Sequence, residues 1–326
     1  MCSSDLPGPR VPPDRFAEIA GWAAGGLALV EGGNEPPIAG RPDLARLSAD
    51  HQAALFRAAR ADRRHRGVEV AGPSYIQGSV ATAQNLSAFV DWGNIHAYPG
   101  AEHPETRGGG SLDRFVAAAG PVFGAAPVIA TENGYHTALA TESAHLPISE
   151  SMRARYLPRL LLWSHLRGVR RTYLYELISS FDLGPANPES HFGLLAHDGQ
   201  PTPAFAAVRN LIRLFSGGGA AADPGEVDLD RAIVATTPDL VAARFRRRDG
   251  TLLVPLWLGI DGWDRSGRRP RPDARPSPVE VLLSRQPRQA RWHRFEDDGS
   301  VSVIGLDPAR RLPLQVTDHL GVLEVS

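Results

Sequence analysis

Short apolar runs alternate with longer amphipathic segments over the first two thirds of the chain. Runs of this length, closed by turn-forming or polar residues, are typical of buried strands. They lie at residues 27–30, 68–71, 93–97, 128–131 and 172–176. In the segments around them, apolar residues recur three and four positions apart, which predicts helices. These lie at residues 14–23, 42–65, 79–90, 112–119, 150–167 and 203–215.

A strand followed by a helix, repeated five times, predicts an α/β fold with a parallel sheet and right-handed crossovers. Successive strands begin about 25 to 45 residues apart, near the roughly 31 residues per unit of an eight-unit barrel. Five strands also suit an open, doubly wound sheet, and the pattern leaves both architectures open. Pro158 is expected to kink the helix at 150–167 or to mark its start.

The pattern changes after residue 215. Residues 216–225 have the Gly-rich composition of a linker. Beyond them, short runs rich in Val, Leu and Phe are separated by Asp249-Gly250 and Asp298-Gly299, which are strong hairpin signals. This pattern predicts an antiparallel β-sandwich over residues 227–326, interrupted by an irregular loop at 264–278.

The expected domains are therefore a barrel portion at residues 7–217 and a β-sandwich domain at 218–326. Trp257, Trp263 and Trp292 lie in the second domain. They could form a carbohydrate-binding face, but core or interface packing is the preferred interpretation.

Composition narrows the classes of partner. The net charge is -1, and all 35 basic residues are Arg, so a nucleic-acid partner is not expected. No apolar stretch is long enough to predict a membrane span. A single cysteine, Cys2, excludes an internal disulfide, and the eleven His lack the spacing of a metal motif. We expect no metal and no cofactor.

Two acidic residues follow predicted strands directly. Glu35 comes after the run at 27–30, and Glu132 after the run at 128–131. In a parallel barrel, both carboxylates would lie at the C-terminal edge of the strands, where barrel enzymes place their chemistry. A pair of carboxylates facing each other is what hydrolysis of a glycosidic bond requires.

Each of these residues also has a structural interpretation. Glu35 could be a helix-start residue and Glu132 a turn residue before Asn-Gly. His96 and Tyr98, at the end of the run at 93–97, could be satisfied polar residues of the core. Glu31, which alternates with Leu29, is expected to have a structural role, either within the barrel mouth or paired with an Arg.

An ordered set of motifs resembles the clan A glycoside hydrolases, over about residues 13–215. Motifs similar to strands four, six and seven of that family are Asn34-Glu35-Pro36, His96-Ala97-Tyr98 and Thr131-Glu132-Asn133-Gly134. Those similar to its eighth strand and final helix are Tyr173-Leu174-Tyr175-Glu176, His191 to Leu195 and Asp198 to Ala204.

The resemblance implies a retaining glycoside hydrolase that acts by double displacement on a β-glycosidic bond. Glu35 would be the acid/base and Glu132 the nucleophile. Implied substrate-binding residues are Asn34 at the sugar 2-hydroxyl, Tyr98 on the nucleophile, His96 lining the site, and Glu176. The implied partner is an oligosaccharide, a polysaccharide or a small β-glycoside.

If the run at 27–30 is strand four, the resemblance implies a partial barrel of strands four to eight. Residues 1–6 look like a translated cloning adapter and lack the features of a signal peptide, so we expect a gene fragment. The location is left open, and the full-length protein could be secreted.

Three functional hypotheses stand at this stage. The first is a retaining glycosidase, either active or inactivated by truncation. The second is a non-catalytic carbohydrate-binding protein, which would tolerate loss of one of the two Glu. The third, a nucleotide-binding domain, lacks the glycine-rich motif that would support it.

Overall fold

The computed structural model describes residues 15–23, 26–61, 65, 67–76, 78–217, 233–235 and 237–326. The predicted adapter at 1–6 and most of the predicted linker, 218–225, lie outside these residues. Backbone contacts divide the chain into two compact units. The first unit comprises residues 1–98, 107–133 and 164–174, and the second comprises 99–106, 134–163 and 175–326.

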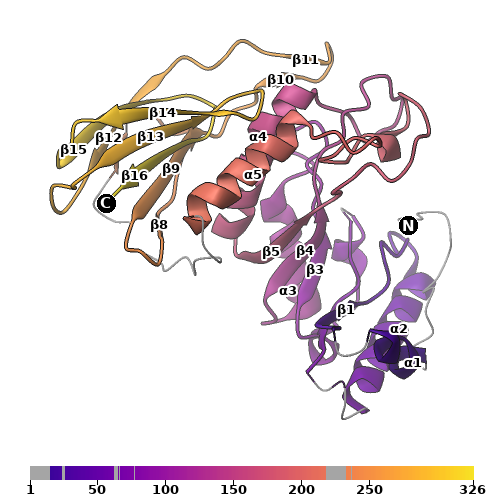
Figure 1. The fold of residues 1–326 in the computed structure, drawn as a ribbon. Helices are drawn as coiled ribbons and strands as arrows, with labels where there is room; N and C mark the ends of the chain where they lie inside the picture. Colours follow the sequence, from indigo (N-terminus) through magenta and orange to yellow (C-terminus); the bar gives the residue numbers. More distant parts are fainter. Residues whose placement is uncertain are drawn as a thin grey trace. The chain divides into compact units, whose positions relative to one another are not determined.

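The first unit is built on five parallel strands. They are β1 (Leu29–Glu31), β2 (Glu69–Ala71), β3 (Gly93–His96), β4 (Val128–Asn133) and β5 (Val169–Leu174). β1 pairs with β2. β3, β4 and β5 form a second parallel sheet (Figure 1). Parallel bridges Ala71–Trp92 and Tyr75–Ile95 join the segment of β2 to that of β3. The predicted α/β fold with parallel strands is confirmed.

Three predicted helices of this unit are present: α1 (Phe16–Trp22), α2 (Pro42–Ala61) and α3 (Leu112–Phe123). α3 packs against β3 through Phe123. A Cβ added at Gly93 would lie 2.7 Å from the Phe123 ring, so only glycine allows this close approach. The packing fixes the start of the strand that carries His96.

The helix predicted at residues 79–90 is wrong. The structure has two short 3₁₀ turns instead, Val80–Thr82 and Ser87–Phe89. Asn85 lies between them, and its side chain accepts hydrogen bonds from the Ser87 backbone N–H and hydroxyl. Side chains of this type compete with the helical backbone for hydrogen bonds, which favours turns.

The second unit contains α4 (Glu150–Leu166, as far as Trp163), the 3₁₀ turn Pro188–Ser190 and α5 (Pro203–Ser216). α4 begins well before Pro158 and continues through it. Thr202 caps α5 by accepting a hydrogen bond from the Phe205 N–H at 3.3 Å. None of the described helices is long and apolar enough to cross a membrane.

The predicted antiparallel C-terminal region is confirmed as two packed sheets and a small hairpin. One sheet has the order β14-β13-β16-β9-β7, with β8 also paired to β9. The other has the order β15-β12-β6. The strands are β6 (Ile233–Ala235), β7 (Leu240–Ala242), β8 (Phe245–Arg246), β9 (Leu252–Leu258), β10 (Trp263–Asp264), β11 (Arg269–Pro270), β12 (Ser277–Leu282), β13 (Ala290–Phe295), β14 (Val301–Leu306), β15 (Arg311–Val316) and β16 (Gly321–Val325).

Both predicted hairpin turns are present, with Gly250 and Gly299 at φ of 86° and 79°. The hairpin β10–β11 lies where an irregular loop was predicted. Trp257, Trp263 and Trp292 are all buried, which confirms that they pack in the interior and do not form an exposed binding face.

A buried ion pair lies within the second unit. The Arg159 side chain is fully buried and pairs with Glu105. The Trp257 indole N–H donates to Glu105 Oε1 at 2.6 Å, and Arg159 also donates to the Asp318 carbonyl at 2.9 Å. Glu105 therefore satisfies a buried cation and a buried indole together.

Replacing Glu105 should destabilise the protein strongly. Glu105→Leu would leave Arg159 and the Trp257 N–H without their carboxylate, and such losses cost about 3 to 5 kcal/mol. Denaturant unfolding measures the change. The matched control is Glu280→Leu, which removes the partner of the exposed Arg311 and should cost less than about 1 kcal/mol. Equal costs for the two variants would contradict the prediction.

Acid should also weaken this unit through His136, which is buried and donates to the His145 carbonyl at 2.8 Å. Burial, reinforced by His145, lowers the pKa of His136 from 6.5 to about 4. Between pH 6.5 and about 4, the unfolded chain therefore binds a proton that the folded chain does not. The free energy of unfolding falls as pH is lowered through this range, by up to about 3 kcal/mol. Urea unfolding at several pH values should show a shallower pH dependence for His136→Gln. Identical slopes for the two proteins would refute the assignment.

Candidate active site

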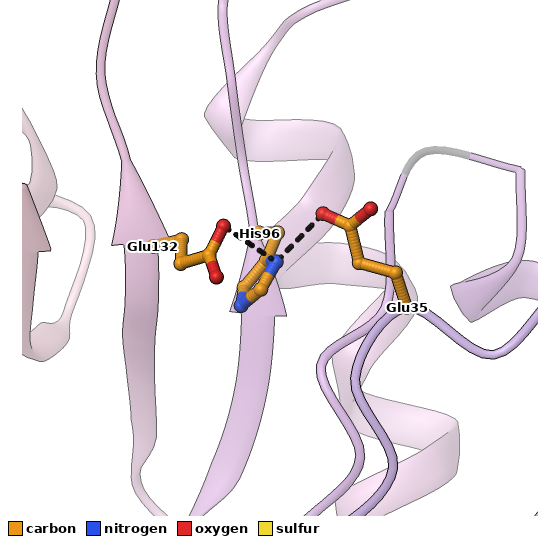
Figure 2. A group of neighbouring side chains, drawn as sticks. All are labelled: Glu35, His96 and Glu132. Carbon is orange, nitrogen blue, oxygen red and sulfur yellow. Dashed lines mark hydrogen bonds and ion pairs between the residues drawn. The ribbon is translucent and has the colours of Figure 1, made fainter. Parts of the chain in front are cut away.

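The candidate site lies where the first unit's parallel strands end. Glu35 follows β1, His96 is the last residue of β3, and Glu132 belongs to β4. The β3–β4 register places His96 directly opposite Glu132. Figure 2 shows the His96 ring between the two carboxylates, with an interaction to each.

The imidazole of His96 is the centre of the cluster. Its Nδ1 atom lies 2.8 Å from Glu35 Oε1 and 3.5 Å from Glu132 Oε2. One carboxylate oxygen from each Glu and a ring nitrogen lie within 4.8 Å of one another. The His96 side chain is fully buried, whereas those of Glu35 and Glu132 are 23% and 17% exposed. Both glutamate side chains therefore remain partly accessible to solvent.

Tyr98 joins the same cluster. Its phenol donates a hydrogen bond to Glu132 Oε2 at 2.8 Å, and its ring meets that of His96 edge to face. The bond requires Oε2 to act as an acceptor, a role that suits an ionised carboxylate. The structure thus brings together four of the predicted site residues: Glu35, His96, Tyr98 and Glu132.

Behind His96 lie polar residues to which the sequence analysis assigned no role. His96 Nε2 is 3.0 Å from Thr131 Oγ1, and Thr131 in turn contacts the fully buried amide of Asn94. Asn94 and His96 are two positions apart in β3, so the alternation of a strand places them on one face. That periodicity is the signal that could have identified Asn94.

Glu31, expected to be structural, also lies in the cluster. Its Oε1 atom is 4.0 Å from His96 Nε2, and its side chain is 27% exposed. Burial raises the pKa of the Glu31 carboxyl, while the nearby His96 and hydrogen bonds from Thr131 and Ser74 partly offset that rise. Three carboxylates therefore surround one imidazole.

The backbone at Glu35 adopts a conformation that is rare for a residue with a side chain. Its φ is 40°, in the left-handed region. The Glu35 N–H donates to the Ser74 carbonyl at 3.1 Å, and the Ser74 hydroxyl donates to Asn34 Oδ1 at 3.2 Å. These bonds from the end of β2 hold the turn, and strain of this kind is common at functional sites.

Two predicted substrate-binding residues, Asn34 and Glu176, do not contact the His96 cluster in the described contacts. Asn34 is exposed beside Glu35 and holds Ser74. Glu176 lies two residues beyond the end of β5, in the second unit, so the predicted strand at 172–176 is misplaced at its end. The Glu176 carboxylate accepts hydrogen bonds from the Ser180 N–H and hydroxyl. Contact of either residue with a sugar stays a prediction.

Two groups of described residues have the ligand types and spacing that a metal ion could use. One is Glu35, His96 and Glu132, and the other is Asp273, Asp318 and His319. In the second group, both Asp already pair with Arg155. In the first group, a direct hydrogen bond accounts for the short contact between His96 and Glu35. We assign a metal to neither, and its expected absence stays a prediction.

Comparison with known proteins bears on the fold. No protein-family model matches the sequence, and no curated protein matches it. Among solved structures, a family 39 glycoside hydrolase from Bacteroides cellulosilyticus WH2 matches with a TM-score of 0.65 and 16% identity, over 99% of this chain and 64% of that one. A β-xylosidase from Caulobacter crescentus CB15 matches with a TM-score of 0.56 and 14% identity, over 91% and 69%.

A GH51 arabinofuranosidase from Xanthomonas axonopodis pv. citri matches with a TM-score of 0.54 and 11% identity, over 92% of this chain and 66% of that one. The chain thus spans about two thirds of the length of these enzymes. Identities this low establish a shared fold and not a shared reaction. The predicted resemblance to clan A glycoside hydrolases is confirmed at the level of the fold.

The left-handed backbone at Glu35 makes a testable prediction. Glycine adopts this conformation without strain, whereas the same conformation costs alanine about 1 kcal/mol or more of conformational energy. Glu35→Gly should therefore be about 1 kcal/mol more stable than Glu35→Ala in urea unfolding, although both lose the same carboxylate. The same pair of substitutions at Glu18, inside α1, is the control and should give the opposite order. Greater stability of Glu35→Ala would show that the turn is not held in the left-handed region.

Proposed function

We propose that the chain is a retaining glycoside hydrolase that cleaves β-glycosidic bonds by double displacement. The observation that carries this proposal is the pair of carboxylates of Glu35 and Glu132, with oxygens within 4.8 Å of each other. Retaining enzymes have carboxyl groups about 5 to 5.5 Å apart, whereas inverting enzymes separate them by about 6.5 to 9.5 Å to admit water. The spacing favours retention.

In the first step, Glu35 donates its proton to the glycosidic oxygen while Glu132 attacks the anomeric carbon. The bond between the anomeric carbon and the leaving oxygen breaks, and a covalent glycosyl-enzyme forms on Glu132. The assignment of roles is supported by the contacts: Tyr98 donates to Glu132, which suits an ionised nucleophile. Glu35 instead faces a ring nitrogen of His96, which can share its proton.

In the second step, Glu35, now ionised, takes a proton from water as that water attacks the anomeric carbon. The ester bond to Glu132 breaks and the sugar leaves with its original configuration. Asn34, exposed beside Glu35, is proposed to bind the 2-hydroxyl, and Glu176 to contact the sugar. His96 lines the site beneath both carboxylates.

We further propose that the five parallel strands correspond to strands four to eight of a (β/α)8 barrel. The proposal is supported by the parallel order of β1 to β5 and by the likeness to barrel glycosidases. The domain division proposed from the sequence, at residues 217 and 218, also stands as a proposal. A non-catalytic carbohydrate-binding protein is the alternative. A binding function alone does not require two carboxylates at this spacing.

The function is tested by release of phenolate from a panel of aryl β-glycosides. Wild-type protein should hydrolyse at least one of them. Glu132→Gln should lower kcat by at least about 1,000-fold, because an amide cannot form the glycosyl-enzyme. The control is Glu142→Gln, an exposed residue of the second unit, which should keep full activity.

Product stereochemistry gives a second readout. Proton NMR of the first-formed sugar should show the β-anomer before mutarotation. An α-anomer would refute retention, and hydrolysis that survives in Glu132→Gln would refute the nucleophile. If wild-type protein cleaves no glycoside of the panel, the enzymatic proposal fails, and sugar binding measured by calorimetry would then favour the alternative.

A further inference from the structure

The β-sandwich holds a cavity that the proposed hydrolysis does not use. Its volume is about 980 Å³, within the range of about 300 to 1,000 Å³ that is usual for ligand pockets. Its walls come from β8, β9 and β16 of one sheet, from β12 of the other, and from the segment that follows β12. All of its described lining residues lie between residues 244 and 326, so the cavity belongs to the second unit alone.

The base of this cavity is aliphatic. Val254, Val281 and Val325 line it and belong to the buried core of the sandwich, each at most 5% exposed. Leu252 and Leu283 also line it and pack against the same core. No aromatic side chain is among the described lining residues, so the cavity offers a sugar ring no stacking surface.

Arginine dominates the polar part of the lining. Five of the described lining side chains are Arg, and the one acidic side chain among them is Asp249. Its carboxylate already has partners, because it lies 3.2 Å from Arg247 Nη2 and accepts a bond from the Thr251 N–H at 2.9 Å. The lining side chains therefore give the cavity a net positive charge.

Four of these arginines can offer N–H groups to a ligand. All four are exposed, and no carboxylate of the described residues forms an ion pair with them: Arg246, Arg285, Arg288 and Arg310. Arg246 and Arg310 each donate one bond to a backbone carbonyl, and a guanidinium has five N–H donors. Since like charges in one cavity repel, a bound anion would relieve that repulsion.

The segment that carries Arg285 and Arg288 is held at both of its ends. At the first end, the Leu283 N–H donates to the Arg310 carbonyl at 2.8 Å. At the second end, the Arg288 N–H donates to the Ser326 carbonyl at 2.7 Å. A ligand therefore does not have to order this backbone when it binds, which lowers the entropic cost of binding.

We propose that this cavity binds an aliphatic carboxylate, an anion with a carboxylate head group and a hydrocarbon body. The guanidinium groups of Arg285 and Arg288 bind the head group, because their paired N–H donors match the two carboxylate oxygens. The hydrocarbon body lies on the aliphatic base. An inorganic anion would leave that base in water, and a neutral sugar would leave the arginines without a counter-charge. The proposal is independent of glycoside hydrolysis, since its test measures binding alone.

Calorimetric titration of the full chain with decanoate is the first test. Decanoate should bind with one-to-one stoichiometry. Decyltrimethylammonium, which carries a cationic head group on the same chain, should bind at least about tenfold more weakly. Hexanoate, about four methylenes shorter, should also bind at least about tenfold more weakly, because it buries less hydrocarbon. No binding of decanoate, or equal affinity for either of the other two compounds, would overturn the proposal.

Substitutions then locate the site. Arg285→Gln and Arg288→Gln each remove one guanidinium and should each raise the dissociation constant for decanoate about tenfold. Both side chains are exposed, so neither change should unfold the protein. The matched control is Arg275→Gln, an exposed position of the same domain that does not line the cavity, and it should bind decanoate as the wild-type protein does.

Two results of this comparison would contradict the assignment. Unchanged affinity in both Arg285→Gln and Arg288→Gln would show that decanoate binds elsewhere. A loss of the same size in Arg275→Gln would show that decanoate responds only to the overall charge of the domain. Either result would overturn the proposed cavity site.

Discussion

The hydrogen bond between His96 and Glu35 is the interaction on which the candidate site depends. Two carboxylates within 4.8 Å of each other repel by about 3 kcal/mol if both are ionised, at the effective dielectric constant typical of protein sites. A ring nitrogen 2.8 Å from one of them can share a proton and remove that repulsion. The buried imidazole therefore makes the close pair tolerable before any substrate arrives.

The backbone makes this cluster possible. Parallel strands present their C-terminal ends at one edge of the sheet, so side chains from β1, β3 and β4 converge although they are far apart in sequence. The close packing of Phe123 on Gly93 fixes the start of β3, and the bonds from Ser74 hold the turn at Glu35. Helix packing and sheet register thus determine the geometry of the carboxylates.

Much of this could be predicted from local patterns. Strand positions follow from apolar runs, and Glu35, His96, Tyr98 and Glu132 stand at or just beyond strand ends, where barrel enzymes place their chemistry. The predicted helix at 79–90 failed because side-chain hydrogen bonds of Asn85 compete with the helix, an effect that apolar periodicity does not record.

Other features depend on contacts between strands distant in sequence. Glu31 and His96 lie 65 positions apart, and no spacing rule connects them. The left-handed φ of Glu35 is accompanied by hydrogen bonds to Ser74, which follows the neighbouring strand β2, and the local sequence of Glu35 gives no sign of them. Glu176 was predicted at the end of a strand over residues 172–176, whereas β5 ends two residues earlier.

The exclusive use of Arg has a consequence for the second unit. Arg155 binds Asp273, Asp297 and Asp318, and Arg159 binds Glu105, all through guanidinium groups that stay charged at any pH a protein survives. A lysine buried at the same position could become neutral by releasing its proton. These ion pairs can therefore fail only from the carboxylate side, so alkali leaves them intact.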